Sequence, residues 1–208
     1  MNLGITGGFG CGKSTAAKLF EKKGFRRLDA DALVRERVLT SPEICEAIRA
    51  HFGQEVFAAD GVVNRKVLAA RVFAEENELR WLEGLVHPRV FDLWQTALAA
   101  DPAAYWAVEI PLLFERNLEN WFDFTVCVAC DPDQQIFRLE QRGLNRALAG
   151  QRISKQLPLA RKIELADFVL WNSGSAEFLE AQVNRLVSVL APTTAPAPGA
   201  ELSPRNQT

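Results

Sequence analysis

Residues 7–14 read Gly7-Gly8-Phe9-Gly10-Cys11-Gly12-Lys13-Ser14, a complete GxxxxGK(S/T) motif close to the start of the chain. Glycines let a backbone curl so that successive N–H groups point inward at phosphate oxygens. In such a loop Lys13 reaches the β- and γ-phosphates, and Ser14 offers its hydroxyl to Mg²⁺. A helix that begins here adds its positive N-terminal end. The motif therefore predicts a site for a nucleoside triphosphate.

The alternative interpretation of the motif is a glycine-rich turn with an incidental Lys-Ser. The segments on either side of the motif favour the phosphate-binding loop. An apolar stretch precedes the loop and a helical pattern follows it, which is the order that a phosphate-binding loop needs. Further along, apolar stretches alternate with amphipathic ones, so we expect an α/β fold with a mostly parallel sheet. The expected strands are residues 1–6, 24–29, 105–110, 124–130 and 168–171. The expected helices are 14–23, 42–51, 65–73, 75–86, 88–100, 133–142, 154–166 and 175–190.

Residues 31–101 lie between the second and third expected strands and are largely helical in pattern. This stretch is too long for a simple crossover between parallel strands, so we expect a helical, substrate-binding insertion on one domain of residues 1–191. Residues 192–208 are rich in Pro, Ala and polar residues and are expected to form a disordered tail.

Composition narrows the class of protein. The 208 residues carry a net charge of −2, whereas nucleic-acid and membrane-surface binders usually carry a positive excess. No apolar run approaches the ~18 residues that would span a bilayer, and no signal-peptide pattern is visible, so a cytoplasmic location is expected. We accordingly expect no nucleic-acid partner and no membrane partner. Independently of composition, we expect small-molecule substrates and a monomer or weak homo-oligomer.

Two of the four cysteines, Cys127 and Cys130, form a CxxC pattern. They fall in an apolar stretch that predicts a buried strand, where residues three apart point to opposite faces and do not form a chelating pair. Cys11 differs because it lies in the phosphate loop near a helix N-terminus. That position can lower the pKa of its thiol and make the loop sensitive to oxidation.

Asp29 ends the second expected strand and Asp31 follows it, so the two carboxylates share one face of an extended backbone. Ligands bind at this carboxyl edge in α/β sheets, and a carboxylate there can deprotonate an acceptor hydroxyl or hold metal-bound water. Asp31 could equally serve as the N-cap of a helix that begins near Ala32. Spacing alone leaves both interpretations open.

Residues 138–162 contain seven basic side chains and the single acid Glu140, a local charge of +6 in an acidic protein. One interpretation is a solvated basic helix face. The other is a mobile lid whose arginines close over the triphosphate, with Gly143 and Gly150 as hinges. The scarcity of acids favours the lid.

Together these residues resemble the dephospho-coenzyme A kinase family of P-loop kinases, over roughly residues 1–191. Besides the loop, the resemblance rests on Asp29-Ala30-Asp31, Asp60-Gly61-Val62-Val63-Asn64-Arg65, His87-Pro88, Pro111-Leu112-Leu113-Phe114-Glu115, the Arg138…Arg142…Gln156 lid and 166–174. Phe9 and Cys11 stand where the family commonly has a smaller aliphatic residue and Ser. Both are variable positions of the motif whose backbone N–H groups bind phosphate, so the expected activity is unaffected.

The resemblance implies transfer of the γ-phosphoryl group of ATP to the ribose 3′-hydroxyl of dephospho-CoA, the last step of coenzyme A biosynthesis, with Mg²⁺. It implies catalytic roles for Lys13, for Asp31 as the base and for Arg142 in the lid. It implies a nucleotide site of Gly10, Cys11, Gly12, Lys13, Ser14, Thr15, Arg138 and Asn172, with Ser14 on the metal and Asn172 near adenine. It implies an acceptor site of Asp31, Arg65, His87, Pro111, Leu112 and Leu113.

Two alternatives remain open at this point. A related P-loop kinase could phosphorylate another small hydroxyl acceptor, such as a nucleoside or sugar acid. A nucleotide-dependent switch without kinase activity is less favoured, because the chain lacks an Asn-Lys-x-Asp guanine motif and carries the arginine-rich segment.

Overall fold

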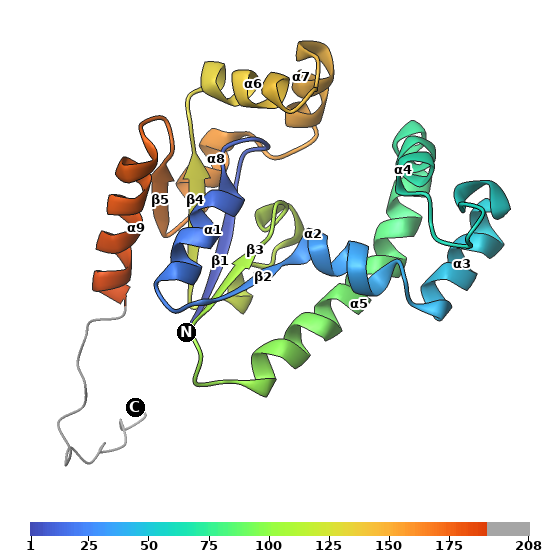
Figure 1. Cartoon of the computed structure of the whole chain (residues 1–208), viewed down its shortest axis with the longest axis horizontal. Coiled ribbons are helices and arrows are strands. Elements are labelled where there is room, and N and C mark those ends of the chain that lie inside the picture. Colours follow the sequence, from blue (N-terminus) through green and yellow to red (C-terminus); the bar gives the residue numbers. More distant parts are fainter. Residues whose placement is uncertain (191–208) are drawn as a thin grey trace.

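The centre of the molecule is a parallel sheet of five strands in the order β2-β3-β1-β4-β5. The structure, a computed structural model, describes residues 1–190, and within them all five predicted strands are confirmed (Figure 1). The strands are β1 (Asn2–Gly7), β2 (Arg26–Asp29), β3 (Trp106–Glu109), β4 (Phe124–Ala129) and β5 (Phe168–Trp171). The predicted disorder of residues 192–208 lies outside the described residues.

β1 is the middle strand and pairs with β3 on one side and β4 on the other. Because all strands are parallel, their carboxyl ends meet at one edge of the sheet. The phosphate loop leaves β1 at that edge, and Asp29 and Glu109 end the neighbouring strands β2 and β3 in direct register with each other. The topology therefore brings together the loop and acidic residues that are far apart in sequence.

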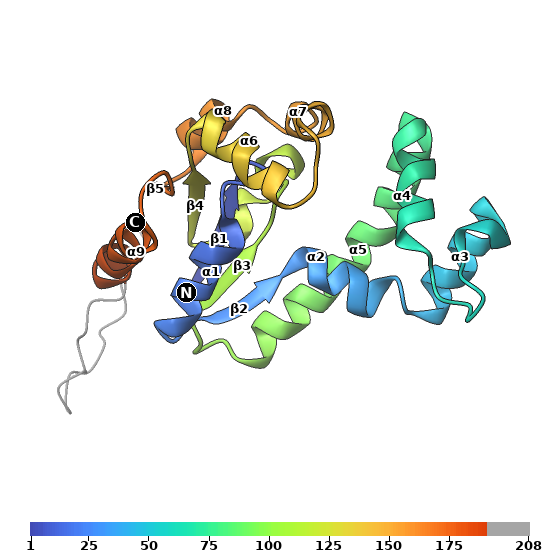
Figure 2. The ribbon, with the colours of Figure 1, turned by 45° about the horizontal axis from the view of Figure 1, so that its top comes forward.

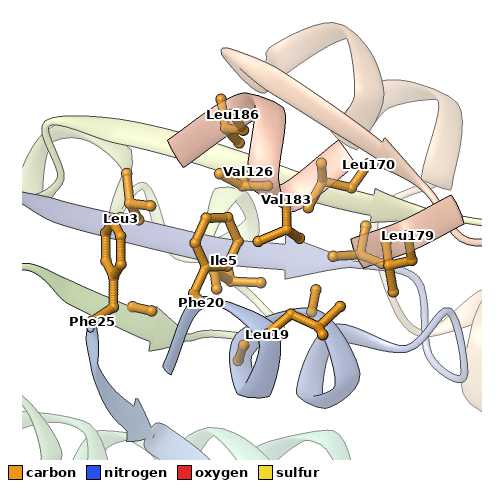
Figure 3. Close-up of a cluster of buried hydrophobic side chains, with 14 residues drawn as sticks. Leu3, Ile5, Leu19, Phe20, Phe25, Val126, Leu170, Leu179, Val183 and Leu186 are labelled. Carbon is orange, nitrogen blue, oxygen red and sulfur yellow. The ribbon is translucent and has the colours of Figure 1, made fainter. Parts of the chain in front are cut away.

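One face of the sheet is covered by α1 (Lys13–Lys22) and α9 (Ala176–Leu190). Side chains alternate along β1, so Leu3 and Ile5 both point into this layer, where they are fully buried. Figure 3 shows them packed with Phe20 of α1 and Val183 of α9. This buried cluster fixes α1, and hence the phosphate loop that leads into it, against the sheet.

The other face packs on α5 (Glu76–Ala100) and on the loop after β3. Trp94 of α5, Val108 of β3 and Leu113 of the loop share one buried cluster there. Gly4 of β1 permits this packing, because a Cβ at Gly4 would lie 2.7 Å from a methyl carbon of Leu113. The absence of a side chain at Gly4 thus lets the loop after β3 lie directly against β1.

Residues between β2 and β3 are largely helical, as the sequence predicted. They form α2 (Ala30–Leu33), a π-helical turn η1 (Val34–Val38), α3 (Pro42–Phe52), a 3₁₀ turn η2 (Gln54–Val56), α4 (Arg65–Ala74) and α5. They have a hydrophobic cluster of their own, which includes Val38, Ile48 and Val72. In both views α3 and α4 stand away from the sheet, to which the long α5 connects them (Figures 1 and 2).

The expected break of this region at His87-Pro88 is wrong, because α5 runs through both residues as one helix. Pro88 has no N–H for the carbonyl of Gly84, a defect that costs about 3 kcal/mol in a helix interior. The helix continues because both of its halves are anchored: Val86 is buried in the helical cluster and Trp94 in the cluster beneath the sheet. Tertiary packing here outweighs the local signal.

After β4 the chain forms α6 (Pro132–Gln141), α7 (Arg146–Ser154) and α8 (Leu159–Leu165). The predicted single helix over 154–166 is wrong, since Pro158 is the N-cap of α8 and separates it from α7. Gly150 lies inside α7 and does not interrupt that helix as expected, whereas Gly143 has a φ of 82° between α6 and α7. Within residues 138–162, a backbone turn that favours glycine therefore occurs only at Gly143, next to the end of α6.

Cys127 lies in β4 and Cys130 just after it, and both are buried and free, as predicted. None of the helices described is long and apolar enough to cross a membrane.

Candidate active site

The phosphate loop follows β1 and uses glycine where other residues would be strained. Gly10 and Gly12 have φ values of 88° and 97°, the left-handed region that L-residues rarely adopt. Gly12 is also the N-cap of α1, and a Cβ there would lie 2.2 Å from the side-chain nitrogen of Asn172. Both conformation and space therefore require glycine at position 12.

The Lys13 side chain turns back over its own loop. Its ammonium nitrogen Nζ donates to the carbonyl oxygens of Gly7 at 3.2 Å and Gly8 at 3.0 Å. Burial lowers the pKa of Lys13, and the nearby positive charge of Lys162 lowers it further. No carboxylate forms an ion pair with Lys13 within residues 1–190, so its charge remains available to an anion in the loop.

Two side chains brace the loop from outside. Gln135 of α6, which is buried, donates from Nε2 to the carbonyl of Phe9 at 2.7 Å. Asn172, which follows β5, donates from Nδ2 to the carbonyl of Cys11 at 2.8 Å. Asn172 thus has a structural role in the loop, and its expected nearness to adenine stays a prediction. The sequence does not reveal this role of Gln135, because a glutamine on a helix belongs to no recognisable motif.

Arg138 of α6 is held by the backbone and still has a free donor. Its Nη2 donates to the carbonyl of Asn172 at 2.8 Å. Its other terminal nitrogen, Nη1, is buried and has no hydrogen-bond partner in the described part of the chain. Buried guanidinium donors are normally satisfied, so this nitrogen is suited to an oxygen of a bound ligand.

At the start of α1, Ser14 and Thr15 are exposed. Neither hydroxyl makes a hydrogen bond among the described residues, so both face outward at the positive end of the helix. Ser14 is therefore free to contact a metal ion or a phosphate oxygen.

The structure separates the two aspartates that the sequence left ambiguous. Asp29 is the N-cap of α2, since its Oδ1 accepts a hydrogen bond from the Ala32 N–H at 3.0 Å. Asp31 lies inside the first turn of α2, so the interpretation of Asp31 as the cap is wrong. The carboxylate of Asp31 is therefore not engaged in capping α2.

Arg27 pairs with the other acids at this edge. Its Nε lies 2.7 Å from Oε1 of the buried Glu109, and a terminal nitrogen lies 3.7 Å from Asp29. Asp31 alone of these three carboxylates has no ion-pair partner within the described residues. Asp31 as a whole residue is exposed, but neighbouring protein atoms shield its carboxyl group from part of the bulk water. This desolvation raises the pKa of Asp31, and the nearby Asp29 carboxylate raises it further.

Lys162 of α8 joins the loop after β3 to the end of the basic segment. This lysine is fully buried, and its Nζ donates to the Pro111 carbonyl at 2.7 Å and pairs with Glu115 Oε1 at 2.8 Å. The same Glu115 oxygen accepts the Leu157 N–H at 2.9 Å, and Thr6 of β1 donates to the Pro111 carbonyl. The sequence places Lys162 in the basic segment but does not reveal this role, because its partners lie about fifty residues away.

The predicted acceptor residues are only partly brought together. His87 on α5 lies near Arg116, which follows the Pro111–Phe114 loop and pairs with Glu83 of α5. Burial lowers the pKa of His87, and Arg116 lowers it further. Leu113 is fully buried, and its side chain packs within the core. Arg65 begins α4, apart from the sheet.

The basic segment lies at the same end of the sheet as the phosphate loop (Figure 1). Arg142 is exposed where α6 ends. Arg152 of α7 lies over the ring of Phe9, 5.7 Å from its centre, and Lys155 lies 4.6 Å from the ring centre of Phe73 in α4. The segment thus contacts both the loop and the helical region across from it.

A surface hollow of about 490 Å³ lies elsewhere, lined by five residues of α3: Pro42, Cys45, Glu46, Arg49 and Ala50. Because one helix supplies its whole lining, it does not form part of the site around the loop.

Comparison with known proteins identifies the family. The sequence profile of the dephospho-CoA kinase family matches residues 1–177. A dephospho-CoA kinase of Thermosynechococcus vestitus is 43% identical over 192 residues, which cover 91% of this chain and 95% of that protein. One from Corynebacterium efficiens is 35% identical over 193 residues, 90% and 96% of the two chains.

Solved structures agree. TT1252 from Thermus thermophilus superposes with a TM-score of 0.73 at 33% identity, covering 92% of this chain and 98% of its own. Dephospho-CoA kinase from Campylobacter jejuni has the same fold, with a TM-score of 0.68 at 24% identity over 91% and 96% of the two chains. The chain belongs to the dephospho-CoA kinase family.

Proposed function

We propose that this protein transfers the γ-phosphoryl group of ATP to the ribose 3′-hydroxyl of dephospho-CoA and releases CoA and ADP. The family and its curated members support the activity of an ATP-dependent kinase in coenzyme A biosynthesis. The observation in the structure that carries the proposal is the carboxylate of Asp31, which has no ion-pair partner within residues 1–190 and lies close enough to Lys13 that each affects the pKa of the other.

In the proposed reaction Asp31 accepts the proton of the acceptor hydroxyl as its oxygen attacks the γ-phosphorus. Asp29 and Glu109 are occupied by the helix cap and by Arg27, which leaves Asp31 as the base. Lys13 balances charge on the β- and γ-phosphates once its hydrogen bonds to Gly7 and Gly8 are exchanged for phosphate oxygens.

Mg²⁺ is part of the proposal. The exposed Ser14 hydroxyl at the start of α1 and the carboxylates at the sheet edge are oxygen donors of the kind that Mg²⁺ prefers. When bound, the ion would neutralise charge on the triphosphate. Ser14 is the residue that we propose as its protein ligand.

The nucleotide and acceptor sites follow from the family resemblance and the contacts above. We assign the triphosphate to residues 10–15 and to the free donor of Arg138, with Asn172 near the base. Arg142 would move onto the transferred group when the basic segment closes. Pro111, Leu112, His87 and Arg65 would surround the acceptor, and the buried Leu113 would support that surface from beneath.

A cytoplasmic location and a monomer or weak homo-oligomer complete the proposal. The four free cysteines support a reducing compartment.

The direct test incubates the purified protein with Mg·ATP and dephospho-CoA and follows CoA and ADP by mass spectrometry. CoA is the matched control acceptor, because its 3′-hydroxyl already carries a phosphate. Formation of ADP and CoA in equal amounts, only with dephospho-CoA, supports the proposal. Equal or faster transfer to a nucleoside or a sugar acid would overturn the acceptor assignment.

A further inference from the structure

Two cysteines far apart in sequence touch beneath the phosphate loop. The Sγ atoms of Cys11, in the loop, and Cys130, directly after β4, are 3.3 Å apart. Cys11 is fully buried and Cys130 is 1% exposed. The other two cysteines make no hydrogen bond to this pair: Cys45 donates to the Leu39 carbonyl, and Cys127 lies within β4. The contact is therefore specific to Cys11 and Cys130.

The surroundings give the two sulfurs different chemical characters. The Cys130 thiol donates a hydrogen bond to Cys11, and this bond, opposed by burial and helped by the charge of Lys13, lowers the pKa of Cys11 to about 7. The same bond raises the pKa of Cys130. The lowered pKa of Cys11 favours its thiolate, which is the form that reacts with oxidants. Burial raises the pKa of Cys127 to about 12, which disfavours its reaction.

We propose that Cys11 and Cys130 form a reversible disulfide in the presence of a small hydroperoxide such as hydrogen peroxide, and that this bond switches off the phosphate loop. The Cys11 thiolate attacks one peroxide oxygen, the O–O bond breaks, and the departing hydroxide takes a proton to become water. The resulting sulfenic acid is attacked by Cys130. The S–S bond forms, the S–O bond breaks, and the Cys130 proton leaves with the hydroxide as a second water. Two thiols lose two electrons, and the peroxide gains them.

The loop has little room to accommodate this bond without changing shape. A disulfide brings its sulfurs to about 2.05 Å, well inside the present 3.3 Å. The Cys11 sulfur packs against Gly8, where a Cβ would lie only 2.7 Å from it, and the Cys11 N–H donates to the Gly8 carbonyl. Drawing Cys11 toward β4 therefore displaces the backbone N–H groups that would cradle the phosphates.

Burial of both sulfurs sets a condition on the reaction. Oxidant reaches Cys11 only when the loop opens transiently, and a bound triphosphate would hold the loop closed. We therefore expect Mg·ATP to slow disulfide formation several-fold. The loss of kinase activity rests on the proposed function, whereas the disulfide and the loss of ATP binding rest on the phosphate loop alone.

The test treats the reduced full-length protein with hydrogen peroxide, with and without Mg·ATP. Remaining thiols are then alkylated, and peptides are mapped by mass spectrometry. We expect the four free thiols to fall to two, with Cys11 and Cys130 joined, and ATP binding and kinase activity to be lost together and restored by dithiothreitol. Four remaining thiols, or a bond between another pair, would overturn the proposal.

Matched variants separate this mechanism from general oxidative damage. Cys130→Ser keeps the size of the side chain and leaves the loop sequence intact, so the untreated variant should bind ATP like the parent. After peroxide it should form no disulfide, and Cys11 should go on to sulfinic acid, which dithiothreitol does not reverse. Cys45→Ser should behave as the parent throughout. A disulfide that forms while ATP binding remains unchanged would overturn the switch, even if dephospho-CoA proved not to be the acceptor.

Discussion

The ammonium group of Lys162 lies 2.8 Å from Oε1 of Glu115, and the Lys162 side chain has no exposed surface. The second carboxylate oxygen of Glu115, Oε2, is buried and has no hydrogen-bond partner among the residues described. The pair links α8 to the loop after β3, and the Pro111 carbonyl extends the link to Thr6 of β1. A buried ion pair of this kind need not add stability over an apolar pair, but removing one partner leaves a buried charge uncompensated.

We predict that Lys162→Met lowers the free energy of unfolding by about 3–5 kcal/mol, because Glu115 is left without its cation. Urea denaturation monitored by circular dichroism measures the change. The exposed Arg161–Glu164 pair on the same helix is the control, and Glu164→Gln should cost less than about 1 kcal/mol. Combining Lys162→Met with Glu115→Leu should recover part of the loss. Equal, small effects at both pairs would contradict the prediction.

The contrast between Asp29 and Asp31 gives a prediction about catalysis. Asp31→Asn should lower kcat by about 10²–10⁴-fold, the usual worth of a general base, with little change in ATP binding. Asp29→Ala should instead lower stability by about 0.5–2 kcal/mol through loss of the α2 cap. Steady-state kinetics and thermal unfolding of both variants test the division. A folded Asp31→Asn protein with turnover near that of the parent would exclude Asp31 as the base.

The raised pKa of Asp31 has a consequence for stability as a function of pH. A higher pKa in the folded state means that the folded protein binds this proton more tightly than the unfolded chain. The neutral carboxyl thus contributes stability at low pH, and this contribution is lost as the pH rises through the raised pKa. Asp31→Asn should therefore be at least as stable as the parent at neutral pH. The difference in stability should shrink toward pH 3.8, the ordinary pKa of an aspartate, where the parent carboxyl group is protonated in the folded state. Urea titrations across this range test the sign, and a variant that is less stable at neutral pH would contradict it.

Lys13 offers a test of the phosphate loop itself. Lys13→Met should lower kcat/KM by on the order of 10²–10³-fold, as removal of a preorganised donor to developing charge does elsewhere. The fold should persist, because no carboxylate in residues 1–190 depends on Lys13 for its pairing. Lys18→Met, on the exposed side of α1, is the matched control and should leave the kinetics unchanged. Similar kinetics in both variants would remove Lys13 from the mechanism.

Local sequence signals predicted the strands and the phosphate loop, because the pattern of apolar residues and the backbone conformations of glycine are set within a few residues. They failed where distant packing decided the outcome. α5 continues through Pro88 because Val86 and Trp94 anchor both halves, and the Lys162–Glu115 pair joins residues with no shared pattern. The role of Asp31 was ambiguous for a different reason: Asp at either of two positions can cap a helix, and only the observed start of α2 at Ala30 assigns the cap to Asp29.

The basic segment supplies the last prediction, which separates a lid from a solvated face. Arg142 is exposed at the end of α6, and Gly143 beside it adopts a turn that favours glycine. If the segment closes, Arg142→Ala should lower kcat by about 10³-fold or more, as loss of an arginine on transferring phosphate does. Amide exchange in residues 142–156 should also slow when ATP and dephospho-CoA are added together. Arg146→Ala, equally exposed, is the matched control and should change kcat far less. Protection of the phosphate loop without any change in residues 142–156 would leave the solvated face as the correct interpretation.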